Sequence, residues 1–215
     1  YIDLPMALSN DANCAALGEV IDGAAKEYKN AVMITLGTGV GGGIVIDKKI
    51  FEGGHAGGTE LGHTTIISGG EYCTCGRHGC FEAYSSATAL IRDTKRATQK
   101  HPDSLLNVLC DGNLDNINGI TPFDAAKQGD FAAKEVIENY IKYLGEGIIN
   151  MVNIFRPDVV LLSGGVCNQG SYLTDPLNDY IQKYCFAGKR AYIPTVIRAT
   201  LGNDAGIIGA ASMIE

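Results

Sequence analysis

Residues 31–49 read AVMITLGTGVGGGIVIDKK and contain two apolar runs separated by glycines. The run from Ala31 to Leu36 is short and apolar, which predicts a buried strand. Glycines then crowd residues 37–43, and Ile44 to Ile46 predicts a second strand that ends at the polar turn 47–49. The stretch therefore predicts a β-hairpin with a glycine-rich tip.

On both sides of this hairpin the sequence predicts helices and strands in alternation. Residues 9–11 (Ser-Asn-Asp) offer helix-capping side chains ahead of apolar positions at helical spacing. Residues 101–120 are rich in Asn, Asp and Gly and predict a surface excursion. The other expected elements are helices over 81–97, from 121, over 130–155, 175–184 and 204–213, and strands over 158–162 and 191–197. This alternation predicts an α/β layer fold.

Composition restricts the class of protein. The 215 residues are 46% hydrophobic, enough for a sizeable core in one domain or two small lobes. Seventeen basic against 24 acidic residues give a net charge of −7, so binding of nucleic acid by bulk electrostatics is not expected. No apolar run approaches the roughly 20 residues that span a bilayer, and no secretory signal is present. We therefore expect a soluble, cytoplasmic protein without a membrane partner.

A histidine and three cysteines supply the soft or borderline donors of a closed tetrahedral zinc site. They are His63, Cys73, Cys75 and Cys80. The carboxylates of Glu60 and Glu82 bracket this set, so a bound metal would hold a loop while presenting two acids beside it. The alternative is a cluster of reduced, buried thiols with an incidental histidine. The remaining cysteines have no framework spacing and are expected to be reduced.

The glycines at 37–43 would let backbone N–H groups approach anionic oxygens, and Thr38 adds a hydroxyl donor. The pattern is neither a P-loop nor a dinucleotide fingerprint, because these glycines join two strands. A hairpin that only turns the chain is an equally common explanation. A second exit from strand to glycine, LSGGV at 162–166, strengthens the interpretation as a phosphate site, since nucleotides often bind at the carboxyl ends of strands.

Asp11 lies at an expected helix start, where the helix dipole favours an anion. Preceded by the amide of Asn10, its carboxylate could orient and deprotonate a substrate hydroxyl, the positioning and base role that kinases require. The alternative is that Asp11 only caps its helix.

Together these segments resemble the ROK family of bacterial sugar kinases and repressors, and most closely its glucokinase-like members. The resemblance rests on NDAN at 10–13 with Glu19, LGTGVGGG at 36–43, ELGH at 60–63, CTCGRHGCFE at 73–82 and LSGGV at 162–166. It implies an actin/hexokinase-like ATPase fold (ribonuclease H-like), with a mixed sheet, flanking helices and a zinc-stapled loop. Two such α/β domains would close over a cleft.

The resemblance also implies a domain assignment. Residues 1–215 would be the carboxy-terminal domain, with residues 1–11 near the interdomain hinge. The chain begins at Tyr1 without an initiator Met, and the amino-terminal domain with its phosphate loop would be missing. We therefore expect the isolated chain to be inactive or nearly so.

Roles for individual residues follow from the resemblance. Asp11 would be the catalytic base that takes the proton of the sugar hydroxyl attacking the γ-phosphate of ATP. The implied sugar-binding residues are Asn10, Asp11, Glu60, His63 and Glu82. Thr38 and Gly39 would contact the ATP phosphates, and Gly164, Gly165 and Val166 would lie near the adenosine. Mg²⁺ would be the catalytic metal, and Zn²⁺ would be structural on His63, Cys73, Cys75 and Cys80. Which nitrogen of His63 faces the zinc and which faces the sugar stays open.

The resulting function is an ATP-dependent kinase acting on the 6-hydroxyl of glucose or a related hexose. The alternative is a sugar-responsive transcriptional repressor of the same family, whose DNA-binding domain would lie outside this chain. A zinc-stabilised binding module without catalysis is a third possibility. The residues do not select one hexose. A homodimer could pack through the helix expected over 130–155, and packing of that helix in the core is the equally open alternative.

Overall fold

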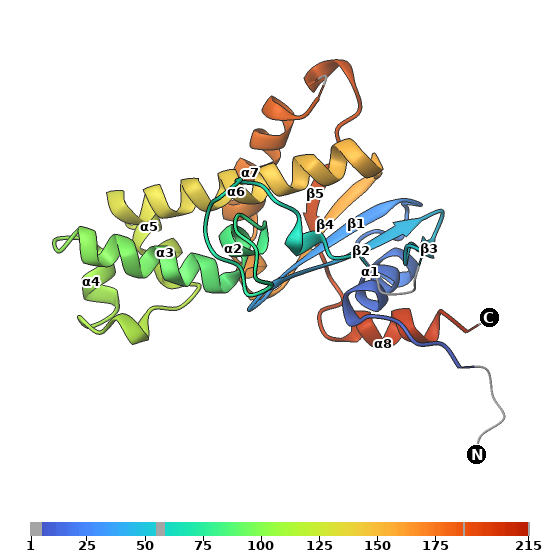
Figure 1. Ribbon diagram of the computed structural model, residues 1–215, viewed down its shortest axis with the longest axis horizontal. Coiled ribbons are helices and arrows are strands. Elements are labelled where there is room, and N and C mark those ends of the chain that lie inside the picture. Colours follow the sequence, from blue (N-terminus) through green and yellow to red (C-terminus); the bar gives the residue numbers. More distant parts are fainter. Residues whose placement is uncertain (1–5, 55–58, 187, 215) are drawn as a thin grey trace.

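The computed structural model describes residues 6–54, 59–186 and 188–214 (Figure 1). The predicted hinge segment, residues 1–11, lies partly outside the described residues. The strands are β1 Ala31–Leu36, β2 Val40–Ile46, β3 Lys49–Ile50, β4 Val159–Ser163 and β5 Thr195–Arg198. The α-helices are α1 Asp11–Asp22, α2 Glu82–Ser85, α3 Ala87–Lys100, α4 Leu105–Leu109, α5 Thr121–Lys127, α6 Phe131–Phe155, α7 Ser171–Tyr184 and α8 Asp204–Ala211.

The five strands form one mixed sheet in the order β3-β2-β1-β4-β5. β1 pairs with β2 in antiparallel and with β4 in parallel fashion, and β5 is parallel to β4. Thr35 of β1 is in register with Ser163 of β4, so both strands end at the same edge of the sheet. The prediction of an α/β fold with a mixed sheet is confirmed.

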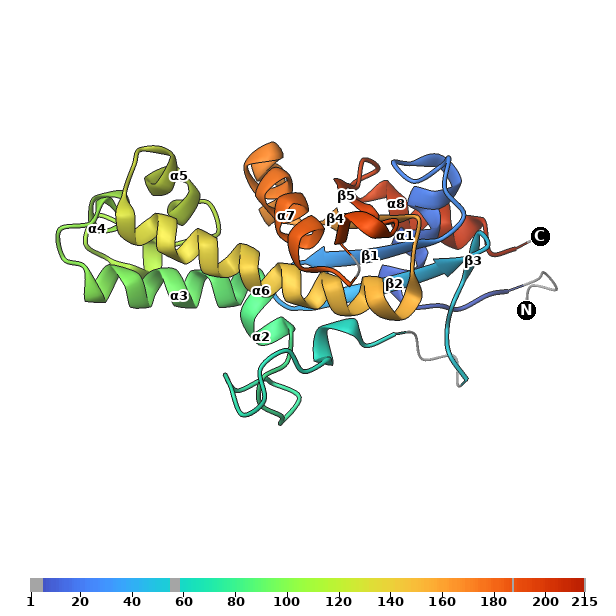
Figure 2. The ribbon, with the colours of Figure 1, turned by 90° about the horizontal axis from the view of Figure 1, so that it is seen from above.

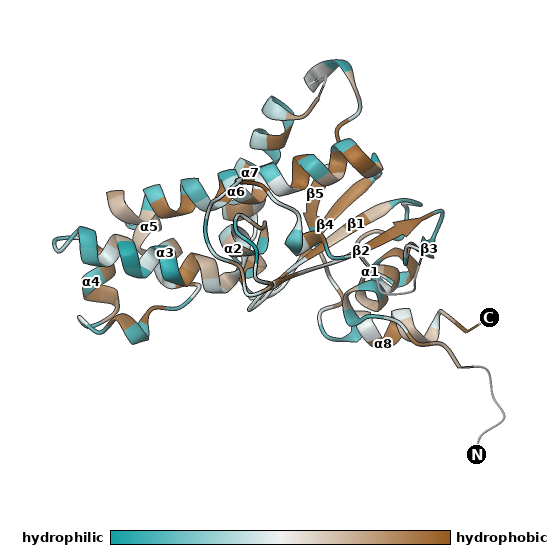
Figure 3. Ribbon diagram, viewed as in Figure 1, coloured by the Kyte–Doolittle hydropathy of each residue, from teal (hydrophilic) through white to brown (hydrophobic). Residues whose placement is uncertain are grey.

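Alternate residues of each buried strand face opposite layers. Val32, Ile34 and Leu36 join the larger core, to which α6 and α7 contribute, whereas Ala31 and Met33 face the smaller core beneath α1. The strands are accordingly hydrophobic along most of their length, and α3 carries hydrophilic stripes (Figure 3).

Helix α1 lies unusually close to its neighbours. An added Cβ at Gly18 would lie 2.1 Å from the carbonyl oxygen of Ala205 in α8, and one at Gly43 would lie 2.6 Å from that of Ala12. Side chains at these glycines would push α1 off the sheet and off α8, because such distances are far inside van der Waals contact. The glycines therefore fix the position of α1 on the sheet.

This packing corrects the predicted hairpin. β2 begins at Val40 rather than Ile44, so the glycines at 41–43 belong to the strand and the tip is only residues 37–39. The sequence pattern suggested an open loop, but these glycines are needed for the close approach of α1 and of the 3₁₀ turn Leu61–His63.

A helical arm extends from the sheet (Figure 2). In it, α6 packs against α3 and α5, and beside the sheet α6 also packs against α7. Three predictions for this part and its surroundings need correction. The helix expected over 81–97 is interrupted at Ser86, whose backbone is extended. The expected surface excursion 101–120 contains the helix α4, and α7 starts at Ser171 rather than near 175. In the described ranges, none of the helices combines the length and apolar character that crossing a membrane requires.

Candidate active site and metal centre

A cleft of about 580 Å³ opens at the edge where β1 and β4 end. It brings together predicted residues from segments that are far apart in the sequence. These are Asn10, Asp11, Gly39, Glu60, His63, Glu82 and Gly164. The cleft therefore unites the predicted base, all five predicted sugar-binding residues and part of both glycine segments.

Asp11 occupies the first turn of α1, as predicted. Asn10 is the N-cap and accepts a hydrogen bond from the backbone N–H of Ala12 at 2.9 Å, and Asp11 Oδ1 accepts from the same N–H at 2.7 Å. Asp11 is exposed to the cleft. Its carboxylate therefore lies at the positive end of the α1 dipole and faces the cleft.

The four predicted metal ligands converge. Their donor atoms all lie within 4.8 Å of one another. Cys73 Sγ is 3.6 Å from His63 Nδ1, and Cys75 Sγ is 3.6 Å from Cys80 Sγ. Zn–S bonds of about 2.3 Å and Zn–N bonds of about 2.0 Å place tetrahedral ligand atoms roughly 3.5 to 3.8 Å apart. The donor set therefore fits zinc, and the two 3.6 Å distances match those of a tetrahedral site.

The orientation of His63 answers a question that the sequence left open. Its Nδ1 faces the cysteines, while the residue also lines the cleft. Nδ1 is thus the nitrogen available to a metal, which leaves Nε2 for a hydrogen bond on the cleft side.

Without a bound cation, the surroundings shift the pKa values of the three thiols in different directions. Burial raises the pKa of Cys80 to about 12, and the neighbouring Cys75 and Cys73 add to that shift. Burial also raises the pKa of Cys73. By contrast, the backbone N–H of Arg77 lowers the pKa of the exposed Cys75. A bound divalent cation would favour all three thiolates, so metal binding would release protons here.

Glu82 connects the metal loop to the glycine hairpin. Its Oε2 accepts a hydrogen bond from the backbone N–H of Val40 at 3.0 Å, and its Oε1 lies 3.6 Å from Cys73 Sγ. One carboxylate oxygen of Glu82, a predicted sugar-binding residue, is thus already hydrogen-bonded to the hairpin.

The residues predicted to contact the nucleotide differ in whether they face a hollow of the surface or the core. Gly164 has φ of 104°, and an added Cβ would lie 2.3 Å from the carbonyl oxygen of Leu36, so only glycine suits this position. Gly165 lines an adjoining hollow of about 310 Å³. Thr38 is exposed at the hairpin tip, whereas the side chain of Val166 packs in the core. Val166 could therefore contact a nucleotide only through its backbone.

Sequence reasoning missed the loop between β5 and α8, although its Gly202 and Asn203 line both hollows. Glu19 of α1, which is fully buried, holds this loop: its Oε1 accepts from the N–H groups of Thr200 and Leu201 at 2.8 and 2.7 Å. An acid on the otherwise apolar inner face of a helix was the available clue, but it does not identify the partner.

A model of the ROK family matches residues 1–215. The chain belongs to the ROK family. A glucokinase of Halalkalibacterium halodurans is 38% identical over 217 residues, covering 99% of this chain and 64% of that protein. A ROK family glucokinase from Streptomyces griseus, solved in complex with glucose and AMPPNP, superposes with a TM-score of 0.88 at 35% identity, covering 99% of this chain and 69% of that one.

Repressors of the family are more distant. The xylose repressor of Bacillus subtilis is 27% identical over 99% of this ROK chain and 51% of its own length. The chain spans about two thirds of the length of the glucokinases it matches. The predicted family and its actin/hexokinase-like fold are confirmed.

Proposed function

We propose that this ROK chain belongs to an ATP-dependent sugar kinase that transfers the γ-phosphate of ATP to the 6-hydroxyl of glucose or a related hexose. The observation that carries the proposal is the cleft itself, in which an exposed carboxylate at a helix start faces acidic residues beside the metal centre and a glycine hairpin. The glucokinase relatives, and the solved relative that holds glucose and an ATP analogue, support the same function.

In the proposed reaction, Asp11 accepts the proton of the sugar hydroxyl as that oxygen attacks the γ-phosphorus. Positioning and electrostatic stabilisation supply most of the catalysis in phosphoryl transfer. The close packing of α1 against the sheet at Gly43 and against α8 at Gly18 holds Asp11 in one place. Mg²⁺, when bound with ATP, would neutralise charge on the phosphates.

Asn10, Glu60, His63 and Glu82 would hydrogen-bond the hydroxyls of the sugar ring. Carboxylates accept from sugar O–H groups, and His63 Nε2 is free to do the same or to donate. Zinc on His63 Nδ1 and the three cysteines would be structural, because four protein ligands leave no open coordination position. Its contribution would be to hold the loop that carries Glu60 and Glu82.

The nucleotide would lie along the glycine segments. Thr38 and Gly39 would meet the phosphates through backbone N–H groups, and Gly164, Gly165 and the backbone of Val166 would border the adenosine. That residues 1–215 form the carboxy-terminal domain, that the protein is cytoplasmic and that it is a homodimer remain predictions.

The test is sugar-dependent release of ADP by the full-length gene product with Mg-ATP, measured across glucose, mannose, fructose, N-acetylmannosamine and N-acetylglucosamine. We expect a strong response to one hexose and its loss in the Asp11→Asn variant. Absence of turnover with every sugar, in folded protein with zinc bound, would contradict the kinase and favour a sugar-responsive repressor.

A further inference from the structure

Residues 82–88 comprise α2, Ser86 and the first two residues of α3, and are called the elbow below. The elbow begins two residues after Cys80 of the proposed metal site and contacts the tip of the glycine hairpin. The tip, residues 37–39, is not stabilised by the strand ladder. Its internal backbone hydrogen bond runs from the Gly37 N–H to the Gly39 carbonyl at 3.0 Å.

The elbow holds the tip by three hydrogen bonds. The N–H of Ala87 donates to the carbonyl of Gly37 at 2.9 Å, and the hydroxyl of Thr88 donates to the carbonyl of Thr38 at 2.8 Å. Glu82 accepts from the N–H of Val40 at 3.0 Å. Consecutive peptide groups of the tip are thus each tied to the same short segment.

These contacts set the direction of the N–H groups at the tip. A trans peptide group is planar, with its C=O and N–H pointing to opposite sides. Because the carbonyl of Thr38 points to Thr88, the N–H of Gly39 points away from the elbow, and Gly39 lines the cleft. By the same reasoning the carbonyl of Gly37 fixes the N–H of Thr38. Two adjacent N–H groups therefore point away from the elbow, an arrangement that binds anions.

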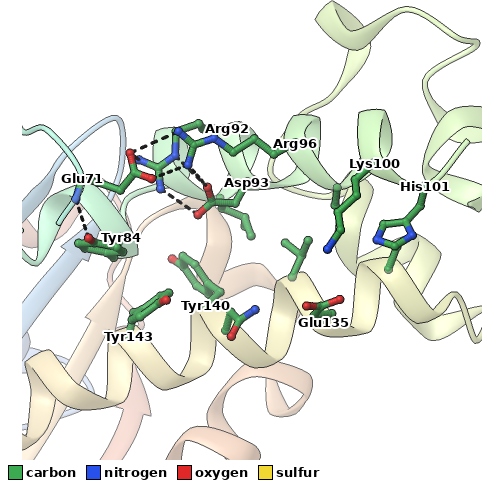
Figure 4. A pocket seen from close by; sticks show the side chains of 15 residues that line it. Glu71, Tyr84, Arg92, Asp93, Arg96, Lys100, His101, Glu135, Tyr140 and Tyr143 are labelled. Atoms are coloured by element: carbon green, nitrogen blue, oxygen red, sulfur yellow. Dashed lines mark hydrogen bonds and ion pairs between the residues drawn. The ribbon is translucent and has the colours of Figure 1, made fainter. Parts of the chain in front are cut away.

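The elbow is itself anchored from its other side, in the cavity between α3 and α6 (Figure 4). Arg92 donates to the carbonyl of Ala83 at 2.8 Å, and the same guanidinium makes two bonds of 2.8 Å to Asp93. The hydroxyl of Tyr140 donates to the carbonyl of Ser85 at 2.8 Å. Because these bonds hold α2, the elbow residues that hydrogen-bond to the tip are themselves fixed in position.

We propose that Thr88 is a positioning residue for the nucleotide phosphates, which holds the Thr38–Gly39 peptide so that its N–H faces the γ- or β-phosphate. This rests on the proposed kinase function. Without the Thr88 hydroxyl, the peptide can rotate and turn a carbonyl oxygen toward the phosphates, which repels them. Thr88 is exposed and its effect is exerted through Thr38 and Gly39.

The test compares Thr88→Val, which keeps the shape but removes the hydroxyl, with Thr88→Ser, which keeps the hydroxyl, in the full-length protein. Losing one neutral hydrogen bond should weaken nucleotide binding roughly 2- to 12-fold. We expect KM for ATP, and the dissociation constant of AMPPNP measured by calorimetry, to rise by that factor in Thr88→Val. Thr88→Ser should match the parent, and KM for the sugar should change in neither variant.

Equal nucleotide affinity in the parent and Thr88→Val would overturn the proposal. So would an equal loss in both variants, or a parallel loss of sugar affinity, since those results indicate a general structural role. If the parent shows no turnover with any sugar, the kinase fails but the calorimetric comparison still decides the role of Thr88. A parent that does not bind AMPPNP at all would overturn both.

Discussion

The two walls of the cleft are built by different means. One wall, which we call the sheet wall, consists of α1 with the glycine hairpin, and its strands share a continuous ladder with β4. The other, the loop wall, is residues 60–82, where the strand-like pairing is confined to the isolated bridges Thr65↔Cys80 and Tyr72↔His78. Regular secondary structure fixes Asp11 on the sheet wall, whereas on the loop wall Glu60 and Glu82 lie beside the cluster of His63 and the three cysteines.

The buried contacts show the same contrast. The hydrophobic residues of β1 belong to the two main cores of the domain. In the loop wall, Leu61 and Phe81 near its two ends join the larger core, whereas Cys73 and Cys80 belong to a small separate cluster with Ala83 and Tyr84 of α2. The middle of the loop, which has little buried apolar surface of its own, depends on other constraints for its order. We therefore expect the chemistry of Asp11 to be insensitive to the metal and the sugar contacts to depend on it.

The largest expected effect separates catalysis from binding on the sheet wall. Asp11→Asn should lower turnover by about 100- to 10,000-fold, the range for loss of a general base. Sugar affinity should stay within a few fold, because the asparagine keeps the side-chain volume and an oxygen that can accept from the N–H of Ala12. Steady-state kinetics and sugar binding by calorimetry on the same full-length preparation measure both quantities. Turnover within tenfold of the parent would show that Asp11 is not the base.

The next effect tests the loop wall. Cys75→Ser should weaken zinc retention by at least the roughly 10- to 100-fold that loss of an outer-shell partner costs. Sugar affinity should fall with it, because His63 and the flanking acids lose their support. Melting of the core should change much less, because the sheet does not contain the site. Zinc content by atomic absorption and sugar binding by calorimetry are the measurements. Cys185→Ser, at a buried cysteine far from the metal centre in sequence, is the matched control. If zinc-free protein bound the sugar with full affinity, the loop wall would not depend on the metal, and the expected difference between the two walls would be wrong.

A smaller effect is expected from crowding the sheet wall. Gly43→Ala places a methyl group 2.6 Å from the carbonyl oxygen of Ala12 and 2.7 Å from the Cβ of Ala16. Displacing α1 should lower the free energy of unfolding by about 1–3 kcal/mol and also reduce turnover, since α1 carries Asp11, the proposed base. Urea denaturation measures the first, with Gly119→Ala, where an added Cβ meets nothing within 4 Å, as the control. An unchanged free energy of unfolding would mean that α1 can shift to make room for the methyl group without loss of stability.

The smallest effect is expected outside both walls. Asp130 caps α6 by accepting from the N–H of Ala133 at 2.8 Å, and it also accepts from the N–H of Leu105 at 2.9 Å. Asp130→Ala should cost about 1 kcal/mol in unfolding free energy and leave the kinetic constants unchanged. A change in KM for either substrate would show that the arm is coupled to the cleft.

Asp130 also gives this effect a pH dependence. Burial opposes ionisation, but the hydrogen bonds from Ala133, Leu105 and Ser104 outweigh it and lower the pKa below 3.8. A carboxylate with a lowered pKa in the folded state stabilises the protein above its unfolded pKa and loses that contribution as pH falls through the folded value. The difference in unfolding free energy between parent and Asp130→Ala should therefore persist from neutral pH down to about pH 4 and shrink below it.

Several predictions from the sequence rest on groups that are close in the chain. The capping of α1 by Asn10, the cap of α6 at Asp130 and the cysteine ligands within eight residues are all short-range patterns, and the structure contains each of them. The hairpin was predicted, but the predicted glycine-rich tip was longer than the observed one, residues 37–39. The spacing of glycines cannot show whether they form a loop or admit a helix, because the neighbouring helix is distant in the sequence.

By itself, the sequence determined the chemistry available to this protein: a carboxylate at a helix start, a donor set of one imidazole and three thiols, and two glycine segments after strands. The tertiary structure alone decided which of these groups meet. Glu82 reaches Val40 across 42 residues, Thr88 reaches Thr38 across 50, and Glu19 reaches Thr200 across 181. Such contacts depend on how the sheet and helices pack together, and no local pattern encodes that packing.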